Sequence, residues 1–241
     1  MSLDENPLTM KKRKAFAKSL ESPWQKFAKK YPKILEGVSV VFDLGSAHGQ
    51  NVLMVTKYVP KAKIVLIDPK VGPTKSLFKN KEYTYLKERF EKADFSKWRG
   101  KKNIVLGLNF LQLFEYPNNQ NKISNKEGVL DKGQVLDKMI ELAGPGGLII
   151  IVDEVYLRGI YGFITGPDDL KNHVYKLRGI YGFITGPEDL FLNKFYNLLA
   201  RGPYKRQSLW EYTHLFKDKK LKILYQENYN RRTYFFALQV E

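Results

Sequence analysis

The sequence has 241 residues, enough for one α/β domain, and 43% of them are hydrophobic, enough for a sizeable core. It has no cysteine, which excludes disulfides, thiolate metal sites and cysteine nucleophiles. Its three histidines lie far apart, so no metal site is predicted. No apolar run approaches the ~18 residues of a membrane span. The polar, lysine-rich start lacks the apolar core of a signal peptide, so we expect a cytoplasmic protein.

The net charge of +16 supports two interpretations. An excess of this size favours polyanionic partners, which makes nucleic acid a candidate partner. Only nine of the 41 basic residues are arginine, however, and lysines dispersed over helices are often a solvated face. Composition leaves both interpretations open, and it does not predict an oligomeric state.

Residues 1–36 are predicted to form an N-terminal helical segment. Ser22 and Pro23 match a helix start, with serine as the N-cap and proline in the first helical position. The helix that follows would carry Trp24, Phe27 and Tyr31 on one face. The preceding stretch, residues 11–20, is basic and is also a helix candidate.

From Val38 onward, strands and helices alternate along the chain. Continuous apolar runs predict strands buried on both faces, and the alternation implies right-handed βαβ crossovers and a mainly parallel sheet. Strands are expected at 38–44, 62–68, 83–88, 103–108 and 148–154, with helices at 49–58, 73–80 and 135–143.

The end of the chain departs from this alternation. A helix is predicted at 205–217, followed by strands at 221–229 and 232–240 that are separated by the polar pair Asn230 and Arg231. So short a connection requires antiparallel pairing. The predicted fold class is therefore α/β, a Rossmann-like doubly wound sheet of seven strands, mostly parallel with a reversed C-terminal strand.

An internal repeat lies between the fifth predicted strand and the 205–217 helix. Residues 157–170 recur as 177–190 with one change, Asp168 to Glu188. Two copies are too few for a solenoid, which needs about three. One interpretation is a lid or substrate-side insert over residues 155–204; the other is a tandem duplication without mechanistic meaning. We favour the insert for the region as a whole.

A glycine-rich turn joins the first strand to the next helix. It reads Asp43-Leu44-Gly45-Ser46-Ala47-His48-Gly49, and its small residues let the backbone turn sharply and approach a ligand. By itself such a turn is a weak signal, since it also occurs in dinucleotide sites and in plain packing.

Polar residues at the ends of the later strands strengthen the signal, because ligands of open α/β sheets bind at the carboxyl ends of the strands. Asp68 ends the second strand, where a carboxylate can accept hydrogen bonds from both ribose hydroxyls of a nucleoside. Asp94 and Phe95 follow the third strand, and Asn109 and Phe110 follow the fourth. Each position also has a purely structural alternative: a helix cap, an exposed loop acid or a strand-end turn.

Together these positions resemble class I S-adenosylmethionine (SAM)-dependent methyltransferases. Residues 38–49 resemble the first motif of that family, D-x-G-x-G-x-G, and 141–154 resemble its paired glycines followed by an apolar strand. The terminal antiparallel pair matches the family's reversed strand. The resemblance covers 36–154 and 205–241, and it is specific as a constellation. One departure is Ala47 at the family's middle glycine.

The resemblance implies a methyltransferase domain over 37–241, with SAM as cofactor and S-adenosylhomocysteine (SAH) as product. It implies that Asp68 holds the ribose and that Asp94 and Phe95 frame the adenine. Asn109 and Phe110 would border the sulfonium. The methionine end would be lined by Asp43, Gly45, Ser46, Ala47 and Gly49.

The sequence does not identify the methyl acceptor, for which a small molecule and RNA both remain candidates. Asp153 and Glu154 end the fifth predicted strand as candidate catalytic carboxylates, or as strand-end caps. His48, Tyr161 and Tyr181 are substrate-side candidates. The N-P-P-Y-type motif of amino-directed base methylation is absent after the fourth strand. The alternative function is a SAM-, nucleotide- or RNA-binding module of the same fold without catalytic activity.

Overall fold

The computed structural model describes residues 7–78, 81–114, 130–156, 207–219, 221–230 and 233–241. The repeat, with its candidate residues Tyr161 and Tyr181, lies outside these residues. Among the helices that the structure describes, none combines the length and the apolar character needed to cross a membrane.

A mixed sheet forms the centre of the molecule, in the order β3-β2-β1-β4-β5-β8-β7. The first five strands are parallel, and β8 runs antiparallel to both β5 and β7. A two-residue strand, β6 (Gln207–Ser208), pairs with the end of β5. The fold predicted from the sequence is confirmed. The path strands are β1 (Val40–Leu44), β2 (Lys63–Ile67), β3 (Tyr83–Leu86), β4 (Asn103–Leu108), β5 (Leu148–Tyr156), β7 (Leu221–Asn230) and β8 (Thr233–Val240).

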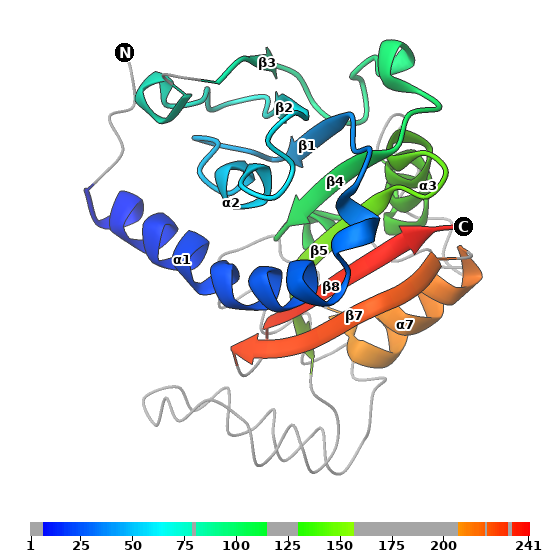
Figure 1. Cartoon of the computed structure of the whole chain (residues 1–241). Helices are drawn as coiled ribbons and strands as arrows, with labels where there is room; N and C mark the ends of the chain where they lie inside the picture. Colours follow the sequence, from blue (N-terminus) through cyan, green and yellow to red (C-terminus); the bar gives the residue numbers. More distant parts are fainter. Residues whose placement is uncertain (1–6, 79–80, 115–129, 157–206, 220, 231–232) are drawn as a thin grey trace, which may run out of the picture.

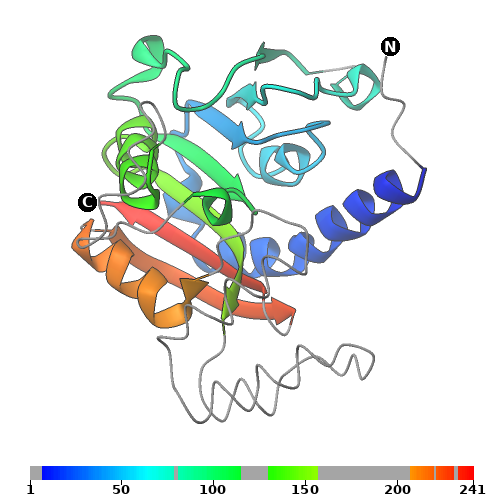
Figure 2. The same cartoon turned by 180° about the vertical axis from the view of Figure 1, so that it is seen from behind.

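Helices cover both faces of the sheet, as Figures 1 and 2 show from opposite sides. One core cluster joins α1 (Pro7–Lys30) and α2 (Val52–Thr56) to the sheet, and the other joins α3 (Lys132–Ala143) and α7 (Leu209–Asp218). Burial on both faces explains why strands such as β1 and β4 are mostly apolar, with Asp43 and Asn103 as their polar residues. The single-turn 3-10 helices are η1 (Pro32–Leu35), η2 (Lys75–Phe78), η3 (Ser96–Trp98) and η4 (Leu111–Leu113).

The predicted helix start at Ser22 is wrong, because α1 is continuous from Pro7 to Lys30 with Pro23 inside it. An internal proline costs about 3 kcal/mol. Leu20, Trp24 and Phe27 are fully buried on both sides of it, and each such side chain contributes about 1.5–3 kcal/mol. Packing against the sheet therefore outweighs the local signal.

The predicted helices at 49–58 and 73–80 are shorter in the structure. Gly49 has φ +77°, which no α-helical residue adopts, so α2 begins only at Val52. A Cβ atom at Gly49 would lie 2.7 Å from Cζ of Phe78, so the same glycine lets η2 pack closely. The segment after β2 accordingly forms one 3-10 turn, Lys75–Phe78.

Candidate functional site

The turn after β1 is folded against the end of β2. The backbone N–H groups of Gly45 and Ser46 both donate to the carbonyl of Ile67, at 2.8 and 3.1 Å. Gly45, Ala47 and Gly49 all have positive φ, at +66°, +46° and +77°. Ala47 therefore adopts a left-handed conformation that costs a residue with a Cβ atom roughly 1–2 kcal/mol. Strain of this kind at a strand-to-helix turn is typical of ligand sites.

Asp68, directly after β2, stabilises this turn by hydrogen bonds. Its Oδ2 accepts from the backbone N–H of Ala47 at 3.1 Å, and its Oδ1 accepts from those of Lys70 and Val71, both at 2.8 Å. Tyr85 on β3 braces the same segment by donating its hydroxyl to the carbonyls of Asp68 and Val71. Asp68 is half-buried at the carboxyl edge of the sheet. Its two carboxylate oxygens can accept further hydrogen bonds from a ligand.

Asp43 lies fully buried at the penultimate position of β1. Burial and, secondarily, the negative charge of Asp68 raise its pKa from 3.8 to about 7, although the backbone N–H of Val52 bonds to it. Its Oδ2 and the Oγ of the nearby Ser46 find no hydrogen-bond partner among the described residues. A cation beside Asp43 would favour its ionised form, so these two buried polar atoms suit a positively charged, hydrogen-bonding ligand.

His48 ties the turn to the segment before η2. Its Nδ1 lies 3.2 Å from Oγ1 of Thr74, and its carbonyl accepts from the backbone N–H of Thr74 at 3.1 Å. The histidine is half-buried. These contacts of His48 stabilise the loop. The substrate-side role predicted for His48 stays a prediction.

Asn109 and Phe110 lie at the carboxyl end of β4, next to the β1 turn. Asn109 has φ +55°, which asparagine tolerates better than most residues, and its N–H donates to the carbonyl of Val152 at 2.6 Å. Phe110 lies against Gly45, where a Cβ atom would come within 3.3 Å of the ring. The fold thus brings four features together at the carboxyl edge of the sheet: the β1 turn, Asp68, Asn109 and Phe110.

Asp94 and Phe95 occupy a different position. Asp94 is exposed, and its carboxylate accepts from the N–H and hydroxyl of Ser96, which lowers its pKa. Phe95 is buried against Phe42 and Trp98. The structure therefore engages Asp94 in its own turn, and the adenine contact predicted for the pair stays a prediction.

A small polar cleft of about 90 Å³ opens beside Asp94. It is lined by Ala93, Asp94, Phe95, Arg99, Lys138, Glu141 and Leu142. Lys138 shapes it from α3, where its ammonium donates to the carbonyls of Phe90, Glu91 and Ala93. The lysine thereby holds the loop after β3 in place, and burial lowers its pKa. The sequence did not indicate Lys138, because nothing distinguishes this lysine from the many others of a basic chain.

Phe90, which the sequence analysis did not single out, joins the two ends of this region. Its ring meets Phe110 edge-on at 5.6 Å and lies 5.5 Å from Phe95. The aromatic rings of Phe95, Phe90 and Phe110 therefore form a continuous apolar row from the loop after β3 to the β1 turn. Among the described residues, no group of three or more His, Asp or Glu side chains could hold a metal ion.

No family model and no curated protein matches the sequence, but solved structures do. The O-methyltransferase NcsB1 of neocarzinostatin biosynthesis, solved with SAM and 2-hydroxy-5-methyl naphthoic acid, is 14% identical with a TM-score of 0.53; the match covers 97% of this chain and 58% of that one. The mitomycin 7-O-methyltransferase MmcR is 12% identical with a TM-score of 0.52, over 85% and 50%. An O-methyltransferase family protein from Burkholderia thailandensis is 13% identical with a TM-score of 0.52, over 94% and 59%.

The chain has the class I SAM-dependent methyltransferase fold. At these identities the likeness shows the fold alone. The chain spans about half to three-fifths of the length of these solved structures.

A second polar group of this methyltransferase fold lies on the other side of β4 from the β1 turn. Asp153, on β5 just beyond the residue that pairs with the end of β4, is fully buried, and its Oδ2 accepts from the hydroxyl of Tyr212 on α7 at 2.8 Å. Lys132, the first residue of α3, is also fully buried, with its Nζ 5.6 Å from the centre of the Tyr212 ring. Sequence reasoning proposed Asp153 but missed Tyr212 and Lys132, which are far from it in sequence. Glu154, the other candidate, is the next residue of β5.

Proposed function

We propose that this chain is a SAM-dependent methyltransferase. The observation that carries the proposal is the joined arrangement of Asp43, Ala47 and Asp68 at the carboxyl edge of a sheet with this strand order. Ligands of open α/β sheets bind at this edge, where the strand order reverses around β1 and β4.

The residues of this edge fit SAM. The half-buried Asp68 carboxylate offers acceptors for the two ribose hydroxyls. The buried Oδ2 of Asp43 and the Oγ of Ser46 lack partners among the described residues and suit the amino and carboxylate groups of the methionine end. Asn109 and Phe110 border the turn. Asp94 and Phe95 remain the proposed adenine contacts.

SAM supplies, when bound, a methyl group already activated by its sulfonium. What the chain has to contribute is therefore alignment, exclusion of water and, where the acceptor must lose a proton, a base. Phe110 and Phe90 provide an apolar wall beside the turn, and both are buried. The ionised form of Asp43 would stabilise the positive charge of the cofactor.

A small molecule is the acceptor that we favour. Among the solved structures that match, MmcR is a mitomycin 7-O-methyltransferase, and NcsB1 was solved with 2-hydroxy-5-methyl naphthoic acid. In this chain η4 and its two flanking residues are largely apolar beyond the end of β4: Phe110 and Phe114 are buried, and Leu113 is exposed. Such a surface suits an apolar or aromatic acceptor.

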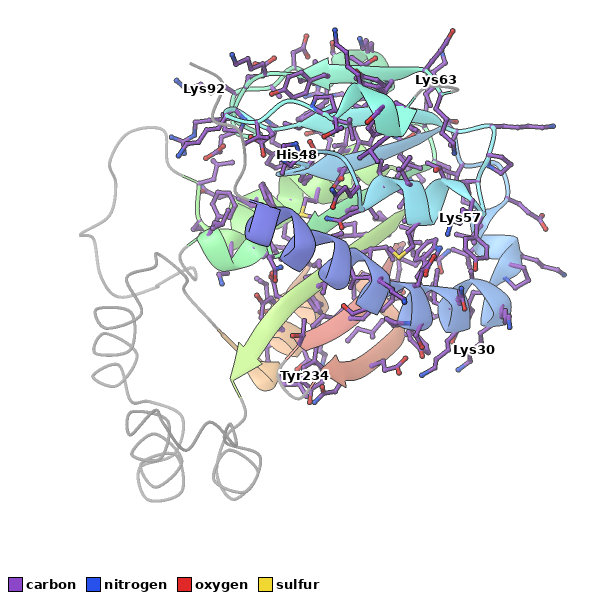
Figure 3. The ribbon with its side chains drawn as sticks, turned by 90° about the vertical axis from the view of Figure 1, so that its left-hand side faces the viewer. Lys30, His48, Lys57, Lys63, Lys92 and Tyr234 are labelled. Carbon is purple, nitrogen blue, oxygen red and sulfur yellow. The ribbon has the colours of Figure 1, made fainter. Side chains whose placement is uncertain are left out.

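The lysine surplus gives weaker support to RNA as acceptor. Lys30, Lys57 and Lys63 project from one side of the molecule (Figure 3). Lys63 begins β2, at the sheet edge opposite the β1 turn. A phosphate backbone bound there would lie away from the proposed methyl-transfer edge. Binding of a single-stranded RNA that falls steeply between low and high salt would favour RNA, and salt-independent or absent binding would exclude it.

Thermal unfolding with SAM and with SAH tests the proposal. A ligand at 100 times its Kd stabilises the folded state by about 2.7 kcal/mol, so Tm should rise with either compound. NADH at the same concentration is the control, because a nicotinamide enzyme would respond to it instead. If neither SAM nor SAH raises Tm at saturating concentration, the proposal fails. Stabilisation without any methyl transfer to acceptors would indicate a binding module without activity.

A further inference from the structure

The amino ends of β1, β2 and β4 form the edge of the sheet opposite the β1 turn, and lysines lie close together there. Lys63 begins β2, and Lys102 directly precedes β4. The last turn of α1 and η1, which lead into β1, contribute three more lysines. We call the whole set the amino-edge lysines: Lys29, Lys30, Lys33, Lys61, Lys63, Lys101 and Lys102.

Backbone pairing in the sheet places lysines of distant segments side by side. Val40, at the start of β1, pairs with Lys63 on one side and with Asn103 on the other. The N–H of Ser39 donates to the carbonyl of Lys102 at 2.9 Å, and the N–H of Lys63 donates to the carbonyl of Ser39 at 3.0 Å. Neighbouring strands are about 4.8 Å apart, so the backbones of Lys63 and Lys102 lie roughly 10 Å apart across β1.

The segment before β1 joins the remaining lysines to this pair. The ammonium of Lys102 donates to the carbonyl of Glu36 at 2.7 Å, and the N–H of Glu36 donates to the carbonyl of Lys33 at 3.3 Å. Figure 3 shows Lys30 and Lys63 on the same side of the molecule. The amino-edge lysines therefore form one continuous surface from the end of α1 to the start of β2.

The positive charge of this surface is not neutralised by the described part of the chain. Segments 29–39, 61–63 and 99–102 contain one acidic residue, the exposed Glu36. Among the described residues, no amino-edge lysine forms an ion pair with a carboxylate, whereas the nearby Lys26 and Lys57 are paired with Glu227 and Glu21. A surface of one sign without internal partners attracts a polyanion.

The composition of the surface indicates the kind of polyanion. Lysine is depleted in interfaces between proteins, and helices that lie on membranes add large apolar side chains to their lysines. Among the described residues, the exposed large apolar side chains are Tyr58, Leu113 and Ile223, and none of them lies in the three segments. The surface therefore offers no exposed ring on which the bases of a single strand could stack. Lysine binds phosphate as a point charge and reads no base pattern there.

We propose that the amino-edge lysines form a docking surface for the phosphate backbone of double-stranded nucleic acid, bound without regard to sequence. A duplex holds its bases inside and presents a dense row of phosphates, which fits a surface of lysines without exposed rings. The surface lies opposite the β1 turn, so a bound duplex leaves the carboxyl edge open. The duplex is thus a binding partner that is separate from the methyl acceptor, and the proposal does not depend on methyl transfer.

Fluorescence anisotropy with a labelled DNA duplex of about 20 base pairs tests the proposal. The amino-edge variant combines Lys33→Gln, Lys61→Gln, Lys63→Gln and Lys101→Gln and keeps Lys102, whose ammonium is hydrogen-bonded. We expect the wild type to bind the duplex with a steep loss of affinity as salt rises. The variant should bind at least about tenfold more weakly at low salt. Its salt slope should be smaller by about 3–4, because each phosphate contact contributes about 0.9.

A matched control removes the same charge from other surfaces of the protein. It combines Lys75→Gln, Lys87→Gln, Lys92→Gln and Lys217→Gln, four exposed lysines outside the three segments. This control should keep the salt slope of the wild type within about 1 and lose at most about threefold in affinity. Thermal unfolding should show that both variants are folded.

Three results would overturn the proposal. The first is the absence of duplex binding by the wild type, and the second is an equal loss in the two variants, which would mean that net charge alone decides. The third is binding of the wild type to phosphatidylserine vesicles but not to the duplex, which would indicate a membrane surface. SAH binding, measured in parallel, should be the same in the wild type and both variants. Its absence from the wild type would contradict the methyltransferase function and leave the docking surface standing.

Discussion

The two ends of the carboxyl edge hold their carboxylates in different ways. Asp68 is bonded by three backbone N–H groups, and the most distant of these lies 21 residues away in sequence. Asp153 is bonded by a phenol hydroxyl 59 residues away. The first arrangement is made from local backbone geometry, and the second depends on α7 packing against β5. We call the end with Asp68, which holds the proposed cofactor residues, the cofactor end, and the end with Asp153, the proposed substrate side, the acceptor end.

The largest expected effect concerns Asp43 at the cofactor end. Its pKa in the folded protein, about 7, exceeds its ordinary value of 3.8, so the folded state binds the proton more tightly than the unfolded state does. The stabilisation is complete below about pH 4 and is lost as the pH rises towards 7. It amounts to on the order of 4 kcal/mol, because a tenfold change in proton affinity is worth about 1.4 kcal/mol.

Urea denaturation of the ligand-free protein at pH 5, 6 and 7 measures this effect. Asp43→Asn, which carries no charge at any of these pH values, is the matched control. We expect the wild type to lose stability relative to the variant as the pH rises. Parallel pH profiles for the two proteins would show that Asp43 is ionised in the folded state throughout.

The second largest effect is expected for Gly49→Ala. The new methyl group would lie 2.7 Å from Cζ of Phe78 and 3.1 Å from Cδ1 of Leu66, and the backbone has φ +77°. Overpacking and strain together should cost about 2–4 kcal/mol of unfolding free energy. Gly100→Ala has a similar φ of +71° but no atom within 4 Å, so it should cost only about 1 kcal/mol. Equal costs would mean that close packing of η2 does not shape the turn.

At the acceptor end, Tyr212→Phe separates stability from cofactor binding. It removes the hydroxyl that donates to the buried Asp153, which should cost about 1–3 kcal/mol in denaturant unfolding. The affinity for SAH, measured by calorimetry, should not change. A variant of normal stability, or one with much weaker SAH binding, would contradict the separation of the two ends.

The smallest effect is expected for Ala47→Gly. Ala47 has φ +46°, so glycine would relieve strain in the folded state, while it also gives the unfolded chain more freedom. We expect a net gain of about 0.5–1 kcal/mol in thermal or denaturant unfolding. Asn51→Gly, at the N-cap of α2 with φ −71°, is the control and should not stabilise. A loss of stability in Ala47→Gly would show that the methyl group makes contacts worth more than the strain.

Sequence reasoning succeeded where structure follows from neighbouring residues. The mainly parallel sheet, the reversed β8 and the approach of Asp68 to the β1 turn follow from apolar runs, a short connection and strand-end acids, since parallel strands bring their carboxyl ends to one edge. It failed where packing between distant segments decides. Pro23 lies inside α1 because Leu20 before it and Trp24 and Phe27 after it are all fully buried.

The acceptor end was harder to predict for the same reason. Nothing near Lys132 in the sequence indicates that its side chain is fully buried, and a lysine in a first helical turn is usually exposed. Tyr212 is one of 15 tyrosines, and only the packing of α7 selects it. Asp94 illustrates the opposite case, because the structural alternative considered for it, a cap of the turn at Ser96, is what its contacts show.

The most direct measurement of the central claim is a calorimetric titration of SAH into the wild type and Asp68→Asn, with Asp137→Asn as control for an exposed aspartate outside the site. We predict one-to-one binding by the wild type, unchanged binding by Asp137→Asn, and binding about 1–3 kcal/mol weaker for Asp68→Asn, because the ribose loses acceptors. Thermal unfolding of Asp68→Asn should confirm that it is folded. Absence of SAH binding by the wild type, or equal affinity in Asp68→Asn, would contradict the account.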